Sequence, residues 1–170
     1  DQVESVVKDL MGLANPGDLR VAPCSLNAVL ESSVRQVAHQ LTYRRITVEM
    51  RLDNGLPDLP LDAGRLKQAF LNLLVNASEA MPTGGRLEIT SGHDADGRIW
   101  CLICDDGVGV EPRLLERVFD PFVSTKPEGV GLGLVNVKAV VEAHGGRISL
   151  RGNSPSGTCA DLSFPGPVHG

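Results

Sequence analysis

The sequence predicts an α+β fold, a two-layer sandwich in which about three helices cover one face of a mixed β-sheet. The order of the predicted elements favours this fold, because helices and strands fall in separate runs along the chain. A length of 170 residues fits one domain with a short appendage. Hydrophobic residues make up 42% of the chain and charged residues 22%, which is typical of a globular protein with a buried core.

The chain opens on a helical pattern. Apolar residues at positions 3, 6, 7, 10 and 13 form one stripe, which suits packing against a partner helix. No cap precedes Asp1, so we expect residues 1–15 to be the remnant of a longer helix. The predicted organisation continues with a linker over residues 16–24, a main domain over residues 25–166 and a tail over residues 167–170.

Two further helices and one strand are expected before residue 82. Ser25 is a suitable N-cap for a helix that runs to Leu41, and Asp62 is one for a helix that runs to Met81. Between these helices, the alternation of residues 46–52 predicts a strand. An Asn-Gly pair and the prolines at positions 57 and 60 then mark a loop.

The second half of the chain is predicted to be richer in strands. The helices expected there are a short one over residues 111–118 and another over residues 131–144, which Gly145 and Gly146 end. An irregular loop over residues 119–128 separates the two helices. Strands bounded by turn residues are predicted at residues 86–91, 99–104, 147–152 and 158–164.

Composition excludes several classes of function. The formal net charge is −5, and the chain has only one Trp, one Tyr and four Phe, so neither phosphate backbones nor bases would find a suitable surface. We therefore expect no nucleic-acid partner. The longest glycine-rich apolar run, residues 129–137, is far shorter than the roughly 20 residues of a membrane helix, so no membrane contact is expected.

The four cysteines are expected to be reduced thiols in the cytoplasm. Cys101 and Cys104 form a CxxC pair, but they lie inside an apolar segment that is predicted to be a buried strand. A spacing of three residues on a strand places the two sulfur atoms on opposite faces of the sheet. The pair is therefore interpreted as packing, and a redox or metal role is not favoured.

A stripe of polar residues runs down the predicted third helix, formed by Gln68, Asn72, Asn76 and Glu79. Asparagine is a mediocre helix former, so two of them one turn apart lower helix propensity without an evident structural gain. One interpretation is a solvated face. The other is a magnesium site, because amide oxygens are suitable ligands for an ion that already carries phosphate oxygens and water.

A second motif, Asp-Asp-Gly-Val-Gly at residues 105–109, follows a predicted buried strand. The carboxylate of Asp105 could accept a hydrogen bond from an amino group of a bound ring, and Gly107 and Gly109 would leave room for that ring. An ordinary turn is the alternative, since Asp-Gly pairs are common in turns.

A third motif places Lys126 and three alternate glycines directly before a predicted helix, in the sequence KPEGVGLGL. Free N–H groups and the dipole at such a helix start favour phosphate, and the lysine adds a positive charge. A flexible loop is the alternative. The sequence matches neither the P-loop motif GxxxxGK[ST] nor the dinucleotide-binding motif GxGxxG, so both of these nucleotide motifs are excluded.

Taken together and in this order, the motifs resemble the boxes of the histidine-kinase ATP-binding domain, in the superfamily of gyrase, heat-shock chaperone, mismatch-repair and histidine-kinase ATPases. The segment QAFLNLLVNASEA resembles the N box, residues 105–109 the G1 box, FDPF the F box and GVGLGL the G2 box. Gly157 and Thr158 resemble the last glycine box. The run FDPFVSTKPEGVGLGL followed by HGG particularly resembles sensor kinases of the nitrogen-regulation type.

The resemblance implies a Bergerat-type ATP-binding fold with ATP and Mg²⁺ as cofactors. It implies that Asn76, with Asn72, holds Mg²⁺, that Asp105 receives the adenine amino group, and that Asn72, Asn76 and Lys126 are the catalytic residues. The residues that it implies for nucleotide binding are Asn72, Asn76, Glu79, Ala80, Asp105, Gly107, Gly109, Val110, Val118, Thr125, Lys126, Gly129, Gly131, Leu132, Gly133, Leu134 and Thr158.

Three departures refine the implied activity. Gyrase-like hydrolases place a glutamate where Asn72 stands, so its absence favours transfer over hydrolysis. Many kinases carry a basic residue at the position of Glu79. None of the four histidines has the sequence context of a phospho-acceptor, and His144 is interpreted as a residue that serves a helix dipole.

The resemblance therefore implies the catalytic domain of a cytoplasmic sensor histidine kinase. Its expected partners are the dimerisation helices of the same kinase, of which residues 1–15 would be the remnant, and a response regulator. Two alternatives stay open: another enzyme of the superfamily, either an ATPase or a serine kinase, and a non-catalytic nucleotide sensor or docking module.

Overall fold

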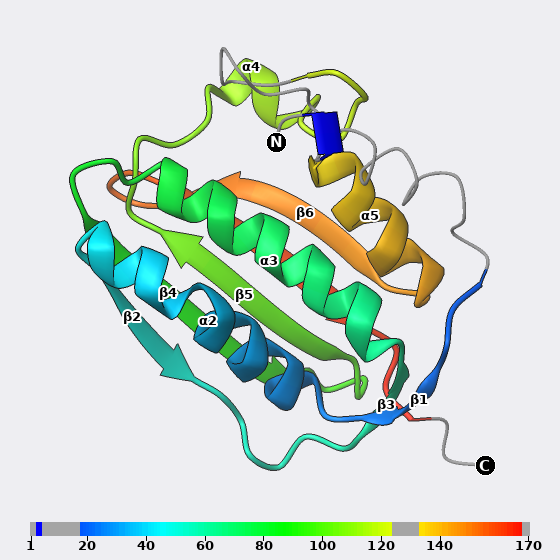
Figure 1. Cartoon of the computed structure of the whole chain (residues 1–170). Coiled ribbons are helices and arrows are strands. Elements are labelled where there is room, and N and C mark those ends of the chain that lie inside the picture. The colour runs from blue at the N-terminus through cyan, green and yellow to red at the C-terminus, as the bar shows by residue number, and fades with distance from the viewer. Residues whose placement is uncertain (1–2, 5–17, 124–132, 168–170) are drawn as a thin grey trace.

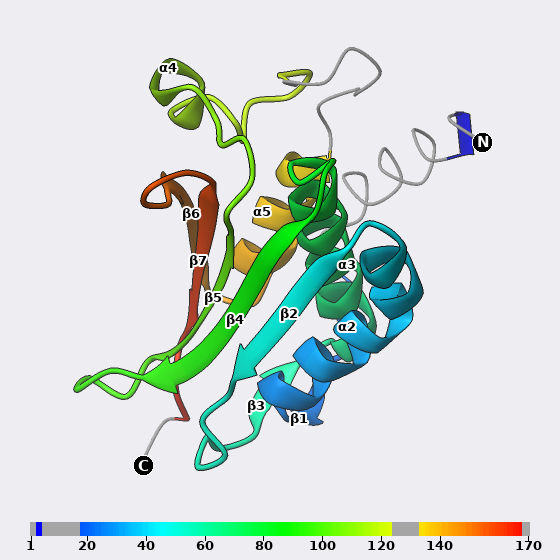
Figure 2. The ribbon, with the colours of Figure 1, turned by 90° about the vertical axis from the view of Figure 1, so that its left-hand side faces the viewer.

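A mixed five-stranded sheet forms one layer of the structure, and three helices cover one of its faces (Figures 1 and 2). The structure is a computed structural model that describes residues 3–4, 18–123 and 133–167. The helices of the covering layer are α2 (Leu26–Tyr43), α3 (Ala63–Glu79) and α5 (Gly133–Ala143). The strands, in their order across the sheet, are β2 (Ile46–Arg51), β4 (Gly85–His93), β5 (Ile99–Asp105), β7 (Thr158–Phe164) and β6 (Arg147–Gly152). The predicted α+β sandwich is confirmed.

The sheet is mixed because of a single parallel pair. Strands β2 and β4 are parallel and are joined through α3, whereas every other neighbouring pair is antiparallel. Strand β5 lies at the centre, and β7 connects it to the edge strand β6. The central strand therefore ends at Asp105 with a neighbouring strand on each side.

The two long helices begin where the sequence predicts. The Ala28 N–H donates to the Ser25 hydroxyl at 3.2 Å, and the Arg65 N–H donates to the Asp62 carboxylate at 3.1 Å. Each N-cap satisfies one of the backbone donors that a helix start leaves unpaired. The apolar faces then pack on the sheet through buried residues such as Leu30, Leu66, Phe70, Leu73 and Leu74.

Two short strands were not predicted from the sequence. β1 (Ala22–Cys24) pairs with β3 (Leu59–Leu61) in a separate antiparallel sheet. Pro23 lies opposite Pro60, and prolines cannot donate to a ladder, which is why the sequence suggested a linker and a loop there. The predicted short helix is also shorter in the structure: α4 spans Pro112–Leu115, and single turns follow it.

His144 connects the start of α3 to the end of α5. Its Nε2 accepts a hydrogen bond from the Asp62 N–H at 2.9 Å, and its Nδ1 lies 2.7 Å from the Val140 carbonyl oxygen. The ring therefore donates from Nδ1 and accepts at Nε2. The ring thus forms a bridge between two helices, which the sequence did not predict, and its Nδ1 contacts a carbonyl in the last turn of α5, the end at which the sequence placed it.

The Asp62 carboxylate stabilises this junction. Partial burial opposes its ionisation, but hydrogen bonds from the N–H groups of Arg20 and Arg65 outweigh burial, so the pKa of Asp62 is lowered. Asp62→Ala is expected to reduce the free energy of unfolding by about 1–2 kcal/mol at neutral pH. Urea denaturation of both proteins measures the difference.

The pH dependence distinguishes this cap from simple packing. Because the folded pKa of Asp62 lies below the unfolded value, the carboxylate's contribution is present above the unfolded pKa and is lost as pH falls through the folded pKa. The difference between wild type and Asp62→Ala should therefore shrink in acid. A difference that stays constant down to strongly acidic pH would contradict the proposed cap.

Candidate functional site

Two asparagines lie one turn apart on the partly exposed side of α3. Asn72 and Asn76 both keep part of their surface accessible, while Leu73 and Ala77 beside them are buried in the core. Within the described residues, the Asn72 carboxamide makes no hydrogen bond. Its oxygen is therefore available to a ligand outside the protein, as the magnesium interpretation requires.

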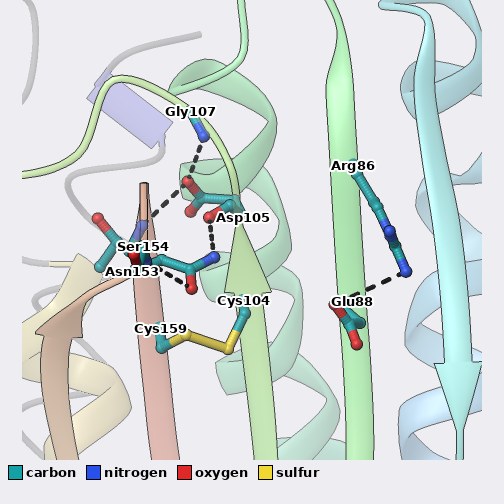
Figure 3. Close-up of a disulfide and its surroundings, with 9 residues drawn as sticks. Arg86, Glu88, Cys104, Asp105, Gly107, Asn153, Ser154 and Cys159 are labelled. Carbon is teal, nitrogen blue, oxygen red and sulfur yellow. Dashed lines mark hydrogen bonds and ion pairs between the residues drawn. A yellow bond between two sulfur atoms is a disulfide. The ribbon is translucent and has the colours of Figure 1, made fainter. Parts of the chain in front are cut away.

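Asp105 is a buried carboxylate at the end of β5, with 6% of its surface exposed. One of its oxygens, Oδ1, accepts a hydrogen bond from the Gly107 N–H at 2.9 Å (Figure 3) and another from the Thr158 N–H at 3.2 Å. No other group of the described residues donates to this carboxylate. The backbone thus fixes one oxygen in place and leaves the other, Oδ2, for a hydrogen-bond donor from a ligand.

The pKa of Asp105 reflects this half-satisfied state. Burial raises the pKa of Asp105, the N–H groups of Gly107 and Thr158 counteract part of that rise, and the charge of Asp106 adds to it. A ligand that donates a hydrogen bond to Oδ2 would supply part of the solvation that burial has removed. The free oxygen therefore suits a hydrogen-bond donor of a ligand, such as an amino group on a ring.

The glycine loop after Asp105 packs tightly against the end of α3. A Cβ atom at Gly107 would lie 2.3 Å from the carbonyl oxygen of Ala80, and the same carbonyl accepts the Val108 N–H at 2.9 Å. Gly109 has a φ of 77°, a conformation that favours glycine. Gly107 is thus required by contacts within the chain, whereas the sequence predicts that its small size leaves room for a ring.

The hairpin between β6 and β7 supports Asp105 from the other side, a role that the sequence did not indicate. The Asn153 carboxamide donates from Nδ2 to the Asp105 carbonyl oxygen at 2.9 Å (Figure 3), and the Ser156 hydroxyl donates to the Asp106 carbonyl oxygen at 3.2 Å. Gly157 packs so closely that a Cβ atom would lie 2.0 Å from the Asp105 carbonyl oxygen. An asparagine in a turn has several possible roles. Its contact with Asp105 follows only from the register of β5 and β7, which the sequence alone does not give.

The third motif is described only from the start of α5. Gly133 and Leu134 form its first residues, and Val118 is buried on the chain that leads toward it. Lys138 on α5 lies over the ring of Phe119, 5.6 Å from its centroid, and so connects this helix to the F-box segment. The other residues predicted for the phosphate loop lie outside the described residues: Thr125, Lys126, Gly129, Gly131 and Leu132.

The expected reduction of all four cysteines is wrong for two of them. Cys104 and Cys159 form a disulfide between β5 and β7, whereas Cys24 and Cys101 are free thiols (Figure 3). Cys101 and Cys104 do lie on opposite faces of the sheet, as their spacing predicts, because Cys101 is in the core and Cys104 is not. The bonded residues are separated by 55 positions, so their pairing is decided by the sheet register.

The described residues hold no group of three or more His, Cys, Asp or Glu side chains that could bind a metal ion. Asn72 and Asn76 would be two ligands of a magnesium ion that also keeps phosphate oxygens and water, which is the usual coordination of Mg²⁺ with nucleotides. Among the helices of residues 18–123 and 133–167, none has the length and apolar character that a membrane span requires.

Comparison with known proteins agrees with the geometry. Residues 61–168 match the family described as histidine kinase-, DNA gyrase B- and HSP90-like ATPases. The sensor histidine kinase ZraS of Klebsiella oxytoca is 34% identical over 170 residues, which is 100% of this chain and 36% of that protein. The signal transduction histidine-protein kinase AtoS of Escherichia coli K12 is 31% identical over 165 residues, 97% of this chain and 27% of that protein. The chain thus spans 36% and 27% of the lengths of these two relatives.

Solved structures share the fold. Full-length ShkA in complex with AMPPNP superposes with a TM-score of 0.84 and 28% identity, over 95% of this chain and 35% of that one. Histidine kinase ThkA in complex with the response regulator protein TrrA gives a TM-score of 0.82 and 25% identity, over 97% of this chain and 47% of that one.

Proposed function

The chain belongs to the family of histidine kinase-, DNA gyrase B- and HSP90-like ATPases, and from this premise we propose that it is the catalytic domain of a two-component sensor histidine kinase. In this proposal the domain binds Mg·ATP and transfers the γ-phosphoryl group to a histidine on a pair of dimerisation helices. The names of its relatives support this activity, since ZraS and AtoS are both histidine kinases.

The observation that carries the proposal is the state of Asp105. A buried carboxylate with one oxygen fixed by two backbone donors and the other oxygen available is suited to accept the amino group of adenine. Guanine presents a carbonyl at the equivalent edge of its ring, and a carboxylate would repel that oxygen. Asp105 therefore favours adenine nucleotides.

The phosphates are assigned to the start of α5. Gly133 and Leu134 begin this helix, whose first N–H groups lack partners within the helix and carry the positive end of its dipole. These groups bind and orient the triphosphate in the proposal. Lys126 and Thr125 add a positive charge and a hydroxyl donor, and Thr158 contributes to the floor of the adenine pocket.

Magnesium is assigned to Asn76 and Asn72, whose neutral amides suit an ion shared with phosphate oxygens. The ion supplies positive charge that offsets the developing charge on the transferring phosphoryl group. The protein residues supply position: α3 holds the asparagines, β5 holds Asp105, and α5 orients the phosphates. Catalysis is therefore a matter of alignment and electrostatics, without a covalent step on this domain.

The acceptor is proposed to be a histidine that is not among the four of this chain. His39 and His93 are exposed on α2 and β4, and His144 is engaged with Asp62 and Val140. None of the described three lies beside Asp105 or the start of α5. The absence of a glutamate at position 72 supports transfer to a nucleophile over activation of water.

The proposed partners are the dimerisation helices that carry the acceptor and a response regulator that receives the phosphoryl group. The structure of ThkA with TrrA supports a regulator of this kind, since it is a complex between a similar kinase and a response regulator. We assign the domain to the cytoplasm, where ATP and the regulator would both be available.

The test is transfer of labelled phosphate in trans. The chain is mixed with γ-labelled ATP, Mg²⁺ and a separately produced helix pair from the full-length protein, in one form with its histidine and in another with that histidine replaced. We expect acid-labile label on the histidine-bearing helices only. Steady release of phosphate by the chain alone would favour an ATPase. Label that is stable to acid would favour a serine kinase. Nucleotide binding with neither phosphate release nor label transfer would favour a nucleotide sensor.

Asn153 is predicted to be a positioning residue for the nucleotide. Asn153→Ala removes the donor to the Asp105 carbonyl oxygen and should weaken ATP binding about fivefold, the effect of one hydrogen bond of about 1 kcal/mol. Titration calorimetry measures the affinity, and Ser154→Ala in the same exposed turn is the matched control. Equal affinities for the two variants would remove Asn153 from the site.

A further inference from the structure

The Cys104–Cys159 disulfide lies at the point where the central sheet ends and the candidate adenine site begins. The two residues are directly opposite each other in the last pair of the β5–β7 ladder, with their Cα atoms 4.0 Å apart. Cys104 is partly exposed on the face of the sheet opposite α2, α3 and α5, whereas Cys159 is buried. Cys104 is therefore the more exposed residue of the pair.

Both cysteines are adjacent in sequence to the residues that form the adenine site. Asp105 follows Cys104, and Thr158 precedes Cys159. The Thr158 N–H donates to Asp105 Oδ1, so this hydrogen bond joins the same two strands as the disulfide, one residue further along. The covalent bond thus fixes the separation of the two backbones that position the carboxylate.

The contacts beyond the disulfide are non-covalent and few. The hydrogen bond from Asn153 and the close approach of Gly157 hold the Asp105 carbonyl oxygen from the β7 side. The cysteines also close a loop across a separation of 55 positions that includes α4 and α5. Cleavage of the disulfide would release this loop and allow the end of β7 to move away from β5.

We propose that Cys104 and Cys159 are a redox modification site through which thiol–disulfide exchange controls adenine-nucleotide affinity. The disulfide form holds Thr158 against Asp105 and binds nucleotide more tightly. The dithiol form loosens that contact and binds it more weakly. This inference depends on the proposed function, because it assumes that Asp105 receives adenine.

The exchange is a two-electron reaction with a dithiol as reductant. A thiolate of the dithiol attacks Cys104 Sγ, the S–S bond breaks, and the electron pair leaves on Cys159 Sγ, which takes up a proton. The second thiol of the reductant then displaces Cys104 Sγ. The protein ends with two thiols and the reductant with one disulfide. In a cytoplasmic protein such pairs are usually transient, which is consistent with a regulatory role.

The experiment measures affinity in both redox states of the same chain. The wild-type protein is equilibrated with oxidised or reduced dithiothreitol, and alkylation followed by mass spectrometry determines whether Cys104 and Cys159 are bonded. Calorimetry with AMPPNP and Mg²⁺ then gives the affinity of each form, well below the melting temperature of both. Cys104→Ser/Cys159→Ser represents the dithiol form without a reductant, and Cys24→Ser controls for the partly exposed free thiol.

We expect the disulfide form to bind AMPPNP about fivefold more tightly than the dithiol form, with the double variant resembling the latter. Cys24→Ser should retain the redox difference. If the double variant does not fold, the comparison of wild-type forms alone decides the matter.

Three results would overturn the inference: no disulfide under oxidising conditions, equal affinities in the two forms, or a lower melting temperature on reduction with unchanged affinity. The last of these would identify a purely structural bond. Absence of AMPPNP binding in both forms would instead overturn the proposed nucleotide site, and the inference with it.

Discussion

Asp105→Asn is expected to abolish detectable ATP binding and to leave the domain folded. The amide can keep its oxygen toward the N–H groups of Gly107 and Thr158, which places its NH₂ group where the adenine amino group would donate. Two donors then face each other in a buried site. The cost is about 3 kcal/mol or more, which is at least a roughly 100-fold loss of affinity by calorimetry.

The stability of the same variant should move in the opposite direction. Burial raises the pKa of Asp105, so the carboxyl favours folding below its unfolded pKa, and that contribution is lost as pH rises through the folded pKa. At neutral pH the wild type therefore carries a burial cost that the neutral amide avoids. We expect Asp105→Asn to unfold at an equal or higher urea concentration at pH 7, an advantage that disappears in acid.

The wild-type affinity for ATP should fall in acid for the same reason. Protonation of Asp105 removes the acceptor, so binding weakens as pH decreases through its raised pKa. Asp106→Asn is the matched control for the substitution, because Asp106 is exposed and its Oδ1 accepts the Arg86 N–H, which an amide oxygen can also do. Wild-type affinity in Asp105→Asn would exclude Asp105 as the adenine acceptor.

The elements that could be predicted from the sequence are those with strong local signals. Ser25 and Asp62 are N-caps because their side chains accept from the helix starts, a property of the residues themselves. The strands at 147–152 and 158–164 were predicted with the observed bounds because a turn of Asn, Ser, Pro and Gly separates them. In contrast, β1 and β3 are strands because they pair with each other, across about 40 residues. Both contain prolines, which argue against strands in the sequence.

The candidate site was predicted in part for the same reason. Asp105 was identified because it ends an apolar strand before a glycine loop, which is visible in the sequence. Asn153, the packing of Gly157 against Asp105 and the Cys104–Cys159 bond were not predicted, because they depend on which strands are neighbours and in what register. The sequence can indicate a residue that contacts a ligand, such as Asp105. The residues that hold this side chain in position come from distant segments of the chain.

Asn76→Asp is the second substitution for which we expect a large effect. The two side chains have nearly the same shape, but the carboxylate adds a negative charge beside the proposed triphosphate. A repulsion of about 2–4 kcal/mol follows if the charges are about 4 Å apart in a partly buried site, which is a roughly 30- to 700-fold loss of Mg·ATP affinity. Magnesium titration at fixed ATP, followed by calorimetry, measures this loss.

A matched control is available on the same helix. Gln68→Glu converts another amide of the polar stripe of α3 to a carboxylate, but Gln68 is exposed and two turns nearer the start of the helix. It adds the same charge, so general electrostatic repulsion would affect both variants, whereas a local effect at the nucleotide would affect only Asn76→Asp. Thermal melting should place both variants close to wild type, with a small decrease for Asn76→Asp because its charge lies near the negative end of the helix dipole. If both variants bind Mg·ATP as wild type does, the polar stripe is a solvated face and the magnesium assignment is wrong.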